Sequence, residues 1–374
     1  MPRIPFTPTI EALPKLVPFV GPEAIERATG ISFLARMGAN ESVFGPSPKA
    51  VEVMREAAGM NWRYSDPENH DLRAALADFH GVSIGNVVIG EGIDGLLGLT
   101  CLMYLETGAT VVTSDGAYPT FNFHVLAHGG RLVKVPMKGD NEDLDALLET
   151  ARRETARVLY VSNPNNPMGS WWSAEEISRL IANLPPKTLL ILDEAYSDTA
   201  PAGTLPALDM ANPQVVRYRT FSKAYGLAGA RIGYALGADD IIEAFDKVRN
   251  HYGINRVGQL GALAALGDQG YLKDVVDRIE RARGMISDVA RANGLRPLPS
   301  ATNFVAIDCG GDAVYAKRVM DGVLAERVFI RKPGVAPLDR CIRVSCGSDA
   351  DIALFGKALP IAIAKAGARS LAAS

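Results

Sequence analysis

Short apolar runs alternate with helical patterns between residues 87 and 236. Strands are predicted at 87–90, 110–114, 132–135, 158–162, 189–193, 215–220 and 231–236, and helices are predicted to begin near Asp94, Tyr118, Asp143 and Ser173. A glutamate three residues after Ser173 is typical of a capped helix start. Strands that alternate with helices favour a mostly parallel sheet with helices on both faces. The sequence therefore predicts an α/β fold.

The pattern changes after residue 255. The segment 255–294 is largely helical, with a break near Gly267 and Gly270, and further elements are predicted as strands around 304–307, 328–331 and 342–345 and helices at 312–326 and 350–366. We interpret this part as a smaller α+β domain. The predicted division gives 41–265 to a large domain, and 1–40 with 266–374 to an N-terminal arm and a small domain. A cleft between two domains is a common place for a substrate.

The glycine-rich segment FSKAYGLAGARIGY, residues 221–234, contains the first candidate site. It places Lys223 directly after Ser222 and eight residues before Arg231. A lysine in a cleft can form a Schiff base with an aldehyde, and a serine and an arginine can hold a phosphate. Pyridoxal 5'-phosphate carries both groups. A loop lysine, a helix arginine and packing glycines remain an alternative explanation of the segment alone.

Two upstream segments end predicted strands in polar residues. SNPNNPMG (162–169) follows an apolar run, and LLILDEAY (189–196) ends in a carboxylate pair followed by a tyrosine. Open α/β sheets bind ligands at this carboxyl edge. Asp193 could there keep a pyridinium nitrogen protonated. A turn would explain the first segment, and a helix cap or a magnesium site the second. Three such segments in this order favour a cofactor site.

Composition excludes several other classes of protein. The net charge is −3 without a basic run, so nothing favours nucleic acid or an anionic membrane. No apolar stretch is long enough to span a membrane, and the N-terminal sequence lacks the apolar region of a signal peptide. The cysteines form no CxxC pair and the five histidines show no metal-ligand spacing. We therefore expect a cytoplasmic protein with reduced thiols and no metal.

With these segments in view, the chain resembles the fold-type I pyridoxal-phosphate-dependent aminotransferases, and most of all the histidinol-phosphate aminotransferase family. The matching segments appear in family order from residue 39 to residue 347: ANES (39–42), GPSP (45–48), RYSDP (63–67), GEGIDGLL (90–97), YPTF (118–121), NPNNPMG (163–169), DEAY (193–196), FSKAYGLAGARIGY (221–234), ATNF (301–304) and IRVSCG (342–347). The resemblance implies a mostly parallel seven-stranded sheet in the large domain. It also implies an enzyme of amino-acid metabolism that exchanges an amino group between a small-molecule amino donor and a 2-oxo acid such as 2-oxoglutarate.

The resemblance also implies roles around the cofactor ring. Lys223 becomes the Schiff-base lysine and the base that moves a proton between the substrate α-carbon and the cofactor. Asp193 becomes the pyridinium partner. Tyr196 is expected to share a hydrogen bond to the ring's phenolic oxygen with Asn166. The alternative for Tyr196 by itself is a core aromatic residue with a hydrogen-bonded hydroxyl.

The cofactor phosphate needs several donors. GEGIDGLL follows a strand and opens a helix, so the backbone amides of Ile93 and Asp94 are expected to face the anion. Ser222 and Arg231 add side-chain donors. Tyr118 is expected to stack on the ring or flank it. In relatives, the tyrosine of RYSDP reaches the phosphate from the neighbouring subunit. Carrying that role to Tyr64 implies a homodimer with shared active sites.

The substrate side is expected to hold Arg343, Arg331, Asn40 and Phe19. Arg343 matches the family arginine for a substrate carboxylate or phosphate, and Arg331 a second phosphate arginine. Phe19 stands where the family usually places a tyrosine whose hydroxyl touches the substrate phosphate. This departure predicts that histidinol phosphate is not the preferred donor and that an aromatic or other L-amino acid competes with it. Two further departures, Met168 for threonine and Gly95 for an acidic residue, leave the cofactor chemistry intact.

Two alternatives have different functions. The first is a pyridoxal-phosphate-dependent decarboxylase resembling threonine-phosphate decarboxylase, whose family shares most of these segments. The second is a cofactor-binding regulator without turnover. Such regulators usually carry a DNA-binding domain, and no basic helix-turn-helix pattern precedes the fold.

Overall fold

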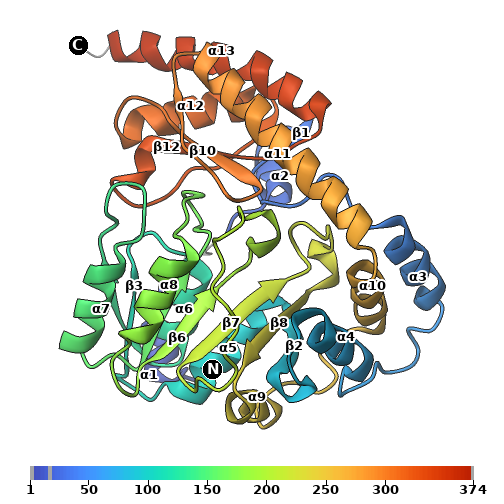
Figure 1. The fold of residues 1–374 in the computed structure, drawn as a ribbon. Helices are drawn as coiled ribbons and strands as arrows, with labels where there is room; N and C mark the ends of the chain where they lie inside the picture. Colours follow the sequence, from blue (N-terminus) through green and yellow to red (C-terminus); the bar gives the residue numbers. More distant parts are fainter. Residues whose placement is uncertain (1–3, 16–18, 372–374) are drawn as a thin grey trace.

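A seven-stranded sheet forms the centre of the molecule. The structure, a computed structural model, describes residues 4–15 and 19–371. The strand order is β2-β8-β7-β6-β5-β3-β4. Strand β8 runs antiparallel to both of its neighbours, and the other pairs are parallel. The predicted mostly parallel sheet is therefore confirmed (Figure 1), with strands β2 (Val87–Glu91), β3 (Thr110–Ser114), β4 (Arg131–Val135), β5 (Val158–Ser162), β6 (Leu189–Asp193), β7 (Val215–Thr220) and β8 (Ile232–Gly237).

Helices cover both faces of this sheet, because each strand buries apolar side chains on two sides. One core joins the sheet to α5 (Gly92–Tyr104), α6 (Pro119–Ala127) and α9 (Asp239–Asp246). A second core joins it to α7 (Leu144–Arg153) and α8 (Ala174–Ala182). A third core packs α3 (Pro48–Ala58), α4 (His70–His80) and α10 (Arg256–Leu266) beside β2 and β8. This is the layered α/β arrangement that the alternation predicted.

Local capping explains where these helices begin. The Ser173 hydroxyl accepts a hydrogen bond from the Glu176 amide at 3.2 Å, and the Glu176 carboxylate accepts one from the Ser173 amide at 3.1 Å. The predicted capping box is therefore present. Helix α5 begins at Gly92, two residues before the predicted start at Asp94. Gly92 has a φ of +72°, a conformation that glycine adopts without a steric cost.

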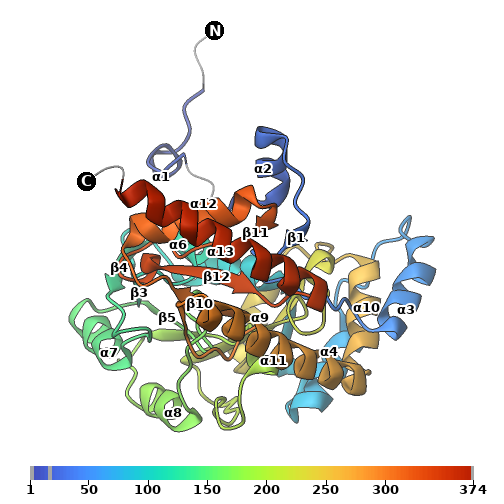
Figure 2. The same ribbon diagram turned by 90° about the horizontal axis from the view of Figure 1, so that it is seen from above.

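The C-terminal region is a smaller α+β layer. Helix α11 (Gln269–Ala292) follows α10 after the predicted break, and a three-stranded antiparallel sheet has the order β12-β10-β9. Its strands are β9 (Arg296–Pro297), β10 (Phe304–Asp308) and β12 (Cys341–Ser345), packed with α12 (Ala313–Ala325) and α13 (Asp349–Leu371). Figures 1 and 2 show this layer above the large sheet. The domain boundaries at 41–265 and 266–374 stay a prediction.

Two strands differ from the prediction beside this layer. Strand β11 (Val328–Phe329) ends two residues early and pairs in parallel with β1 (Ala35–Arg36). The chain then leaves the ladder, and Arg331 forms an isolated bridge with Arg343 instead. Strand β8 begins at Ile232 because Arg231 takes a left-handed conformation, with a φ of 59°. Both departures place arginines outside regular strands, and Arg231 lines the cavity described below.

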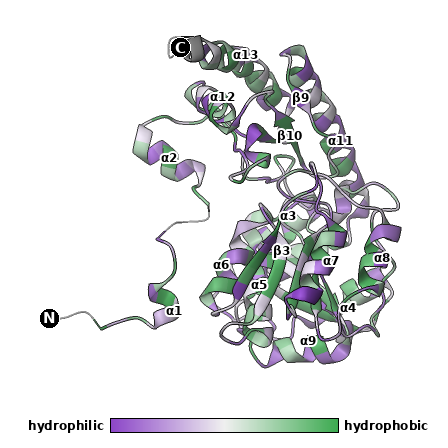
Figure 3. Cartoon of the chain, turned by 90° about the vertical axis from the view of Figure 1, so that its left-hand side faces the viewer, coloured by the Kyte–Doolittle hydropathy of each residue, from purple (hydrophilic) through white to green (hydrophobic). Residues whose placement is uncertain are grey.

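The N-terminal segment lies outside the packed body, as Figure 3 shows for α1 (Pro8–Glu11) and α2 (Pro22–Thr29). Within the described ranges, no helix is long and apolar enough to cross a membrane. No group of His, Cys, Asp and Glu side chains there is arranged to hold a metal ion. The four cysteines are free and buried, as predicted: Cys101, Cys309, Cys341 and Cys346.

Candidate active site

A cavity of about 260 Å³ lies at the carboxyl edge of β5, β6 and β7. The cleft expected at this edge of a parallel sheet is therefore present. Every residue that the sequence assigned to the cofactor lines it, except Tyr64: Ile93, Asp94, Tyr118, Asn166, Asp193, Tyr196, Ser222, Lys223 and Arg231. Residues that are up to 138 positions apart in the sequence therefore converge on one cavity.

Lys223 presents its amine to this cavity. The ammonium nitrogen donates a hydrogen bond to the backbone carbonyl of Asn40 at 3.1 Å and lies 5.7 Å from the centre of the Tyr196 ring. Burial, reinforced by the nearby Arg343 charge, lowers the pKa of Lys223 from 10.5 to about 8. A large part of the lysine is therefore neutral in mildly alkaline solution, the form in which an amine is a nucleophile and a base.

Asp193 is held from two sides at the end of β6. The Tyr160 hydroxyl donates to its Oδ2 at 2.6 Å, and the Ala195 amide donates to its Oδ1 at 3.0 Å. Burial raises the pKa of Asp193, because a desolvated carboxylate lacks a compensating charge. A protonated ring nitrogen is a cation that would supply this charge. Tyr160 stacks on Phe121, with ring centres 4.5 Å apart, so the hydroxyl that orients Asp193 is itself fixed.

Tyr196 belongs to a network that joins the large sheet to the C-terminal region. Its hydroxyl accepts a hydrogen bond from the Asn40 side-chain amide at 2.9 Å. Asn40 in turn receives hydrogen bonds from Ser345, at its Oδ1 (2.9 Å), and from Asn303, at its backbone carbonyl (2.9 Å). Asn40 has a left-handed φ of 57°, which asparagine tolerates better than most residues. Asn40 thus sits between the lysine and the tyrosine.

One end of the cavity is built to receive an anion. Helix α5 starts there, so the backbone amides of Ile93 and Asp94 belong to the unpaired N-terminal turn. Arg231 lies against this turn, since a Cβ added at Gly92 would come within 2.5 Å of its guanidinium. Ser222 adds a hydroxyl. This set of donors fits a phosphate.

The residues together meet the requirements of pyridoxal phosphate. Anion donors occupy one end of the cavity, the Asp193 carboxylate faces it from β6, and the Lys223 amine lies in the same cavity. Tyr118, the N-cap of α6, is partly buried at its wall, and burial raises the pKa of its hydroxyl. Tyr118 therefore stays a neutral aromatic surface that can pack against a ring.

The substrate side contains two arginines. Arg343 donates to the Asn166 side-chain oxygen at 2.6 Å and to the Gly38 carbonyl at 3.2 Å, while its Nε is buried without a partner among the described residues. Burial lowers the pKa of Arg343 to about 10. Asn166 is thus paired with Arg343, and it lines the same cavity as Tyr196. The expected sharing of the ring's phenolic oxygen between Asn166 and Tyr196 stays a prediction. Arg331 and Arg343 are joined by two backbone hydrogen bonds, which form an isolated antiparallel bridge.

Phe19 lies beside the second arginine. The Arg331 guanidinium is 4.4 Å from the centre of the Phe19 ring, and in the described ranges it makes no hydrogen bond or ion pair to a side chain. Burial lowers the pKa of Arg331. Asn40 and Arg343 thus contact residues of the cavity wall, Asn40 through Lys223 and Tyr196 and Arg343 through Asn166. Phe19 and Arg331 contact each other but are not among the residues that line the cavity.

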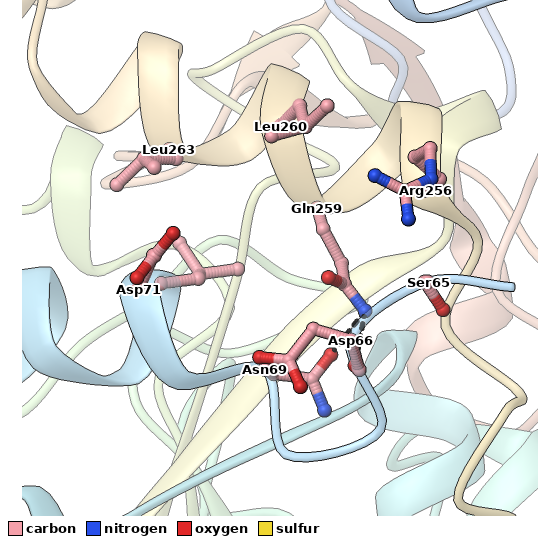
Figure 4. A pocket seen from close by; sticks show the side chains of 9 residues that line it. Ser65, Asp66, Asn69, Asp71, Arg256, Gln259, Leu260 and Leu263 are labelled. Carbon is pink, nitrogen blue, oxygen red and sulfur yellow. Dashed lines mark hydrogen bonds between the residues drawn. The ribbon is translucent and has the colours of Figure 1, made fainter. Parts of the chain in front are cut away.

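Tyr64 does not reach the cavity of its own chain. Its residue surface is 77% exposed, and its ring lies 4.7 Å from that of Tyr252. A neighbouring pocket of about 230 Å³ between α4 and α10 is shown in Figure 4. There the Gln259 amide already bonds the Asp66 carbonyl at 2.9 Å and the Asn69 side chain at 2.7 Å. This second pocket lacks the lysine and the strand-end carboxylate of the first.

Sequence reasoning missed several residues that position the site. Tyr160 was treated only as part of an apolar strand, although it lies on the same face of the sheet edge as Asp193. Asn303 was quoted in ATNF without a role. A buried glutamate, Glu142, was not considered at all. A polar group at an otherwise apolar strand position could have identified Tyr160, but no local pattern points to the other two.

Comparison with known proteins agrees with this geometry. Residues 34–359 match the family model for aminotransferase class I and II. Histidinol-phosphate aminotransferase 2 of Pseudomonas fluorescens is 33% identical over 364 residues, covering 96% of this chain and 97% of that protein. The histidinol-phosphate aminotransferase of Erythrobacter litoralis is 37% identical over 316 residues, covering 79% and 86%. The crystal structure of histidinol-phosphate aminotransferase from Sinorhizobium meliloti in complex with pyridoxal-5'-phosphate has a TM-score of 0.94 and 54% identity, covering 98% of each chain.

Proposed function

We propose that this chain, which belongs to the aminotransferase class I and II family, transfers the amino group of histidinol phosphate to a 2-oxo acid such as 2-oxoglutarate. The enzyme is a pyridoxal-phosphate-dependent aminotransferase. When bound, pyridoxal phosphate supplies an aldehyde that condenses with amines and a ring that accepts an electron pair. The protein supplies the groups that hold this cofactor and move protons beside it.

The chain's own residues have separate tasks in this proposal. Lys223 supplies the amine and moves the proton at the substrate α-carbon, for which a lowered pKa is favourable. Asp193 would hold the ring nitrogen in its protonated form, and Tyr196 and Asn166 would donate hydrogen bonds to the ring's phenolic oxygen. Ile93, Asp94, Ser222 and Arg231 form the phosphate cradle that the start of α5 and the cavity lining support.

The choice of donor rests on one observation, the pair Arg331 and Arg343. The two residues are bridged through their backbones, and Arg343 has an unpaired buried Nε. Neither guanidinium group has a carboxylate partner among the described residues, which favours a substrate that brings a doubly charged anion. A phosphate monoester meets this demand better than a single carboxylate. The relatives named histidinol-phosphate aminotransferases support the same donor.

Phe19 favours the opposite choice, and one measurement decides between the two. Phe19→Tyr adds a hydroxyl to the ring that lies over Arg331. We expect it to raise kcat/KM for histidinol phosphate relative to L-phenylalanine by up to about tenfold, the value of one hydrogen bond near 1.4 kcal/mol. The ratio of kcat/KM for the two donors, with 2-oxoglutarate as acceptor, is measured in both proteins.

Phe19→Leu is the matched control, since it removes the ring without adding a donor, and it should not improve the phosphorylated donor. An equal effect of Phe19→Tyr on both donors would argue against a phosphate near residue 19. A wild-type preference for L-phenylalanine would restore the expectation drawn from the sequence and remove histidinol phosphate as the proposed donor.

The same reaction mixture distinguishes transamination from decarboxylation. Transamination forms glutamate from 2-oxoglutarate, whereas a decarboxylase releases carbon dioxide. Histidinol phosphate has no carboxylate to lose, and the family relatives are named aminotransferases. The decarboxylase and the regulator are therefore not favoured. We also propose a cytoplasmic location, which the four free thiols support.

We further propose a homodimer in which Tyr64 completes the active site of the partner subunit. Three exposed aromatic side chains support this proposal: Trp62, Tyr64 and Tyr252 are 78%, 77% and 54% exposed. Exposed aromatic clusters are typical of protein interfaces. The Tyr64 carbonyl is held by Arg256 at 2.6 Å, so the backbone that presents this ring is anchored.

Mixing two inactive variants tests this dimer. Lys223→Ala and Tyr64→Ala protomers should regain activity together, because their heterodimer contains one site with both an intact lysine and the partner's tyrosine. Activity is measured after subunit exchange has been verified by native mass spectrometry. Lys223→Ala mixed with Asp193→Asn is the control and should stay inactive, since both residues act within one chain. The same lack of recovery with Tyr64→Ala would contradict the shared site.

A further inference from the structure

Glu142 is a buried carboxyl group that the proposed reaction does not use. It is 2% exposed and lies just before α7, whose N-cap is Asp143. Its Oε1 accepts a hydrogen bond from the Asn165 side chain at 2.8 Å and one from the Ser162 amide at 3.4 Å. Its Oε2 is buried without a hydrogen-bond partner among the described residues. A buried acid group of this kind is costly and calls for an explanation.

The groups around Glu142 do not neutralise it. Within the described ranges, no lysine, arginine or histidine forms an ion pair with it. The Ser114 hydroxyl on β3 is near this carboxyl, but it is buried and has no hydrogen-bond partner among the described residues. The nearby Asp193 on β6 adds a negative charge. Burial accordingly raises the pKa of Glu142 to about 8. At neutral pH the group is mostly an uncharged carboxylic acid.

The hydrogen bond to Asn165 links Glu142 to the strand-end loop 162–169. Asn165 is 2% exposed, and its side-chain oxygen accepts a hydrogen bond from the Met168 amide at 3.1 Å. Its backbone bonds Ser170 at 2.7 Å and Gly169 at 2.9 Å, so it closes the turn from within. The side chain of Asn165 is thus fixed at one end by the loop and at the other by Glu142.

The next residue in this loop is part of the site. The Asn166 side-chain oxygen accepts the 2.6 Å hydrogen bond from Arg343, and Asn166 lines the cavity. The same loop is tied to the end of β6, since the Asn163 amide donates to the Asp193 carbonyl at 2.9 Å. A displacement of Asn165 would therefore move the partner of Arg343 directly.

We propose that Glu142 is a positioning residue. By accepting the hydrogen bond of the Asn165 side chain, it places Asn166 where its side chain can accept the hydrogen bond from Arg343 and also contact a bound cofactor. This inference rests on the proposed function only for its substrate readout. Its first readout uses the cofactor-bound protein without any substrate, so failure of the histidinol-phosphate proposal and failure of the Glu142 proposal are distinguishable.

The test compares Glu142→Gln and Glu142→Leu with wild type. Glutamine keeps an oxygen that can accept from Asn165, whereas leucine removes it. We expect the pH midpoint of the visible absorbance of the cofactor-bound protein to rise by at least about half a unit in Glu142→Leu, because Asn166 then stabilises the ring's phenolate less. KM for the amino donor should rise about tenfold while kcat changes by less than about threefold, since Lys223 and Asp193 lie on other elements. Glu142→Gln should stay close to wild type at pH 7.

A control at Trp172, three residues after this loop, separates positioning from a general loss of stability. The Trp172 indole donates to the backbone carbonyl of Glu142 at 3.1 Å, so Trp172→Phe weakens the same contact region without touching the carboxyl. It should lower the melting temperature but leave the absorbance midpoint unchanged. If Trp172→Phe shifts the midpoint as much as Glu142→Leu does, or if Glu142→Leu has the wild-type midpoint and KM, the proposal is wrong.

A further variant keeps the test decisive if Glu142→Leu does not fold. Glu142→Asp retains the acid but withdraws it from Asn165 by one methylene. The absorbance midpoint of Glu142→Asp should rise by at least about half a unit, as expected for Glu142→Leu, while Glu142→Gln keeps the wild-type midpoint. Equal midpoints in wild type, Glu142→Asp and Glu142→Gln would overturn the assignment.

Discussion

Lys223→Ala is expected to lower transamination by several orders of magnitude while the protein still binds pyridoxal phosphate noncovalently. The physical reason is that Lys223 supplies the amine that lines the cavity, and its nitrogen donates a hydrogen bond to the Asn40 carbonyl at 3.1 Å. The phosphate cradle and Asp193 remain in the variant, so cofactor binding survives the loss of the nucleophile and base. The measurement is kcat/KM for amino donor and 2-oxoglutarate, with cofactor content measured separately.

Borohydride reduction provides the second readout for the same residue. Reduction of the cofactor-bound wild type should bleach the visible absorbance and attach the cofactor to Lys223, as located by peptide mass mapping. A label on any other lysine, or no label, would refute the site. Lys187→Ala is a suitable control because that lysine lies in the turn before β6, outside the cavity lining, and it should leave both activity and labelling unchanged.

The pKa of Lys223 adds a pH dependence with a definite sign. Burial lowers this pKa to about 8, so the ammonium form predominates below that pH and the reactive neutral amine above it. The rate at which cofactor-free protein captures pyridoxal phosphate covalently should therefore rise with pH and level off above about 8. If the rate keeps rising as the pH approaches 10.5, the ordinary pKa of lysine, the amine is solvated rather than buried.

Asp193→Asn is expected to have the second-largest effect. The substitution keeps the shape of the side chain and removes the negative charge that compensates a protonated ring nitrogen. Burial already raises the pKa of Asp193, which indicates how strongly this carboxylate depends on a nearby cation. We expect the single-turnover rate of α-proton removal to fall by about a hundredfold or more, the scale for losing one preorganised electrostatic contact. Cofactor affinity should fall much less, because the phosphate donors are intact.

Tyr160→Phe is the matched control for Asp193. It removes the 2.6 Å hydrogen bond to the Asp193 carboxylate and keeps the charge. Its effect on the single-turnover rate should be under about tenfold, because the charge of Asp193 and its hydrogen bond from the Ala195 amide remain. Near-normal single turnover in Asp193→Asn, or an equal loss in both variants, would show that the charge of Asp193 is not the acting feature.

Local patterns predicted the elements of the large sheet because their causes are local. All seven strands were found within two residues of their predicted bounds, since runs of apolar side chains between polar ends are a property of neighbouring residues. The capping box at Ser173 was equally visible for this reason. The antiparallel direction of β8 was not predicted. Strand direction depends on how the connection crosses the sheet, and no period in the sequence records it.

The sequence by itself determined which residues gather at the carboxyl edge of the large sheet, and the tertiary structure decided the rest. Asp193 ends one strand of the large sheet, and Lys223 and Asn166 follow two others, so all three lie at the edge where the ends of neighbouring parallel strands meet. The pairing of Arg331 with Arg343, the position of Asn40 between Lys223 and Tyr196, and the support of Asn165 by Glu142 could not be predicted in this way. Asn40 and Ser345 are 305 positions apart in the chain. Contacts of that range depend on how separately formed layers pack, and packing leaves no local pattern to read.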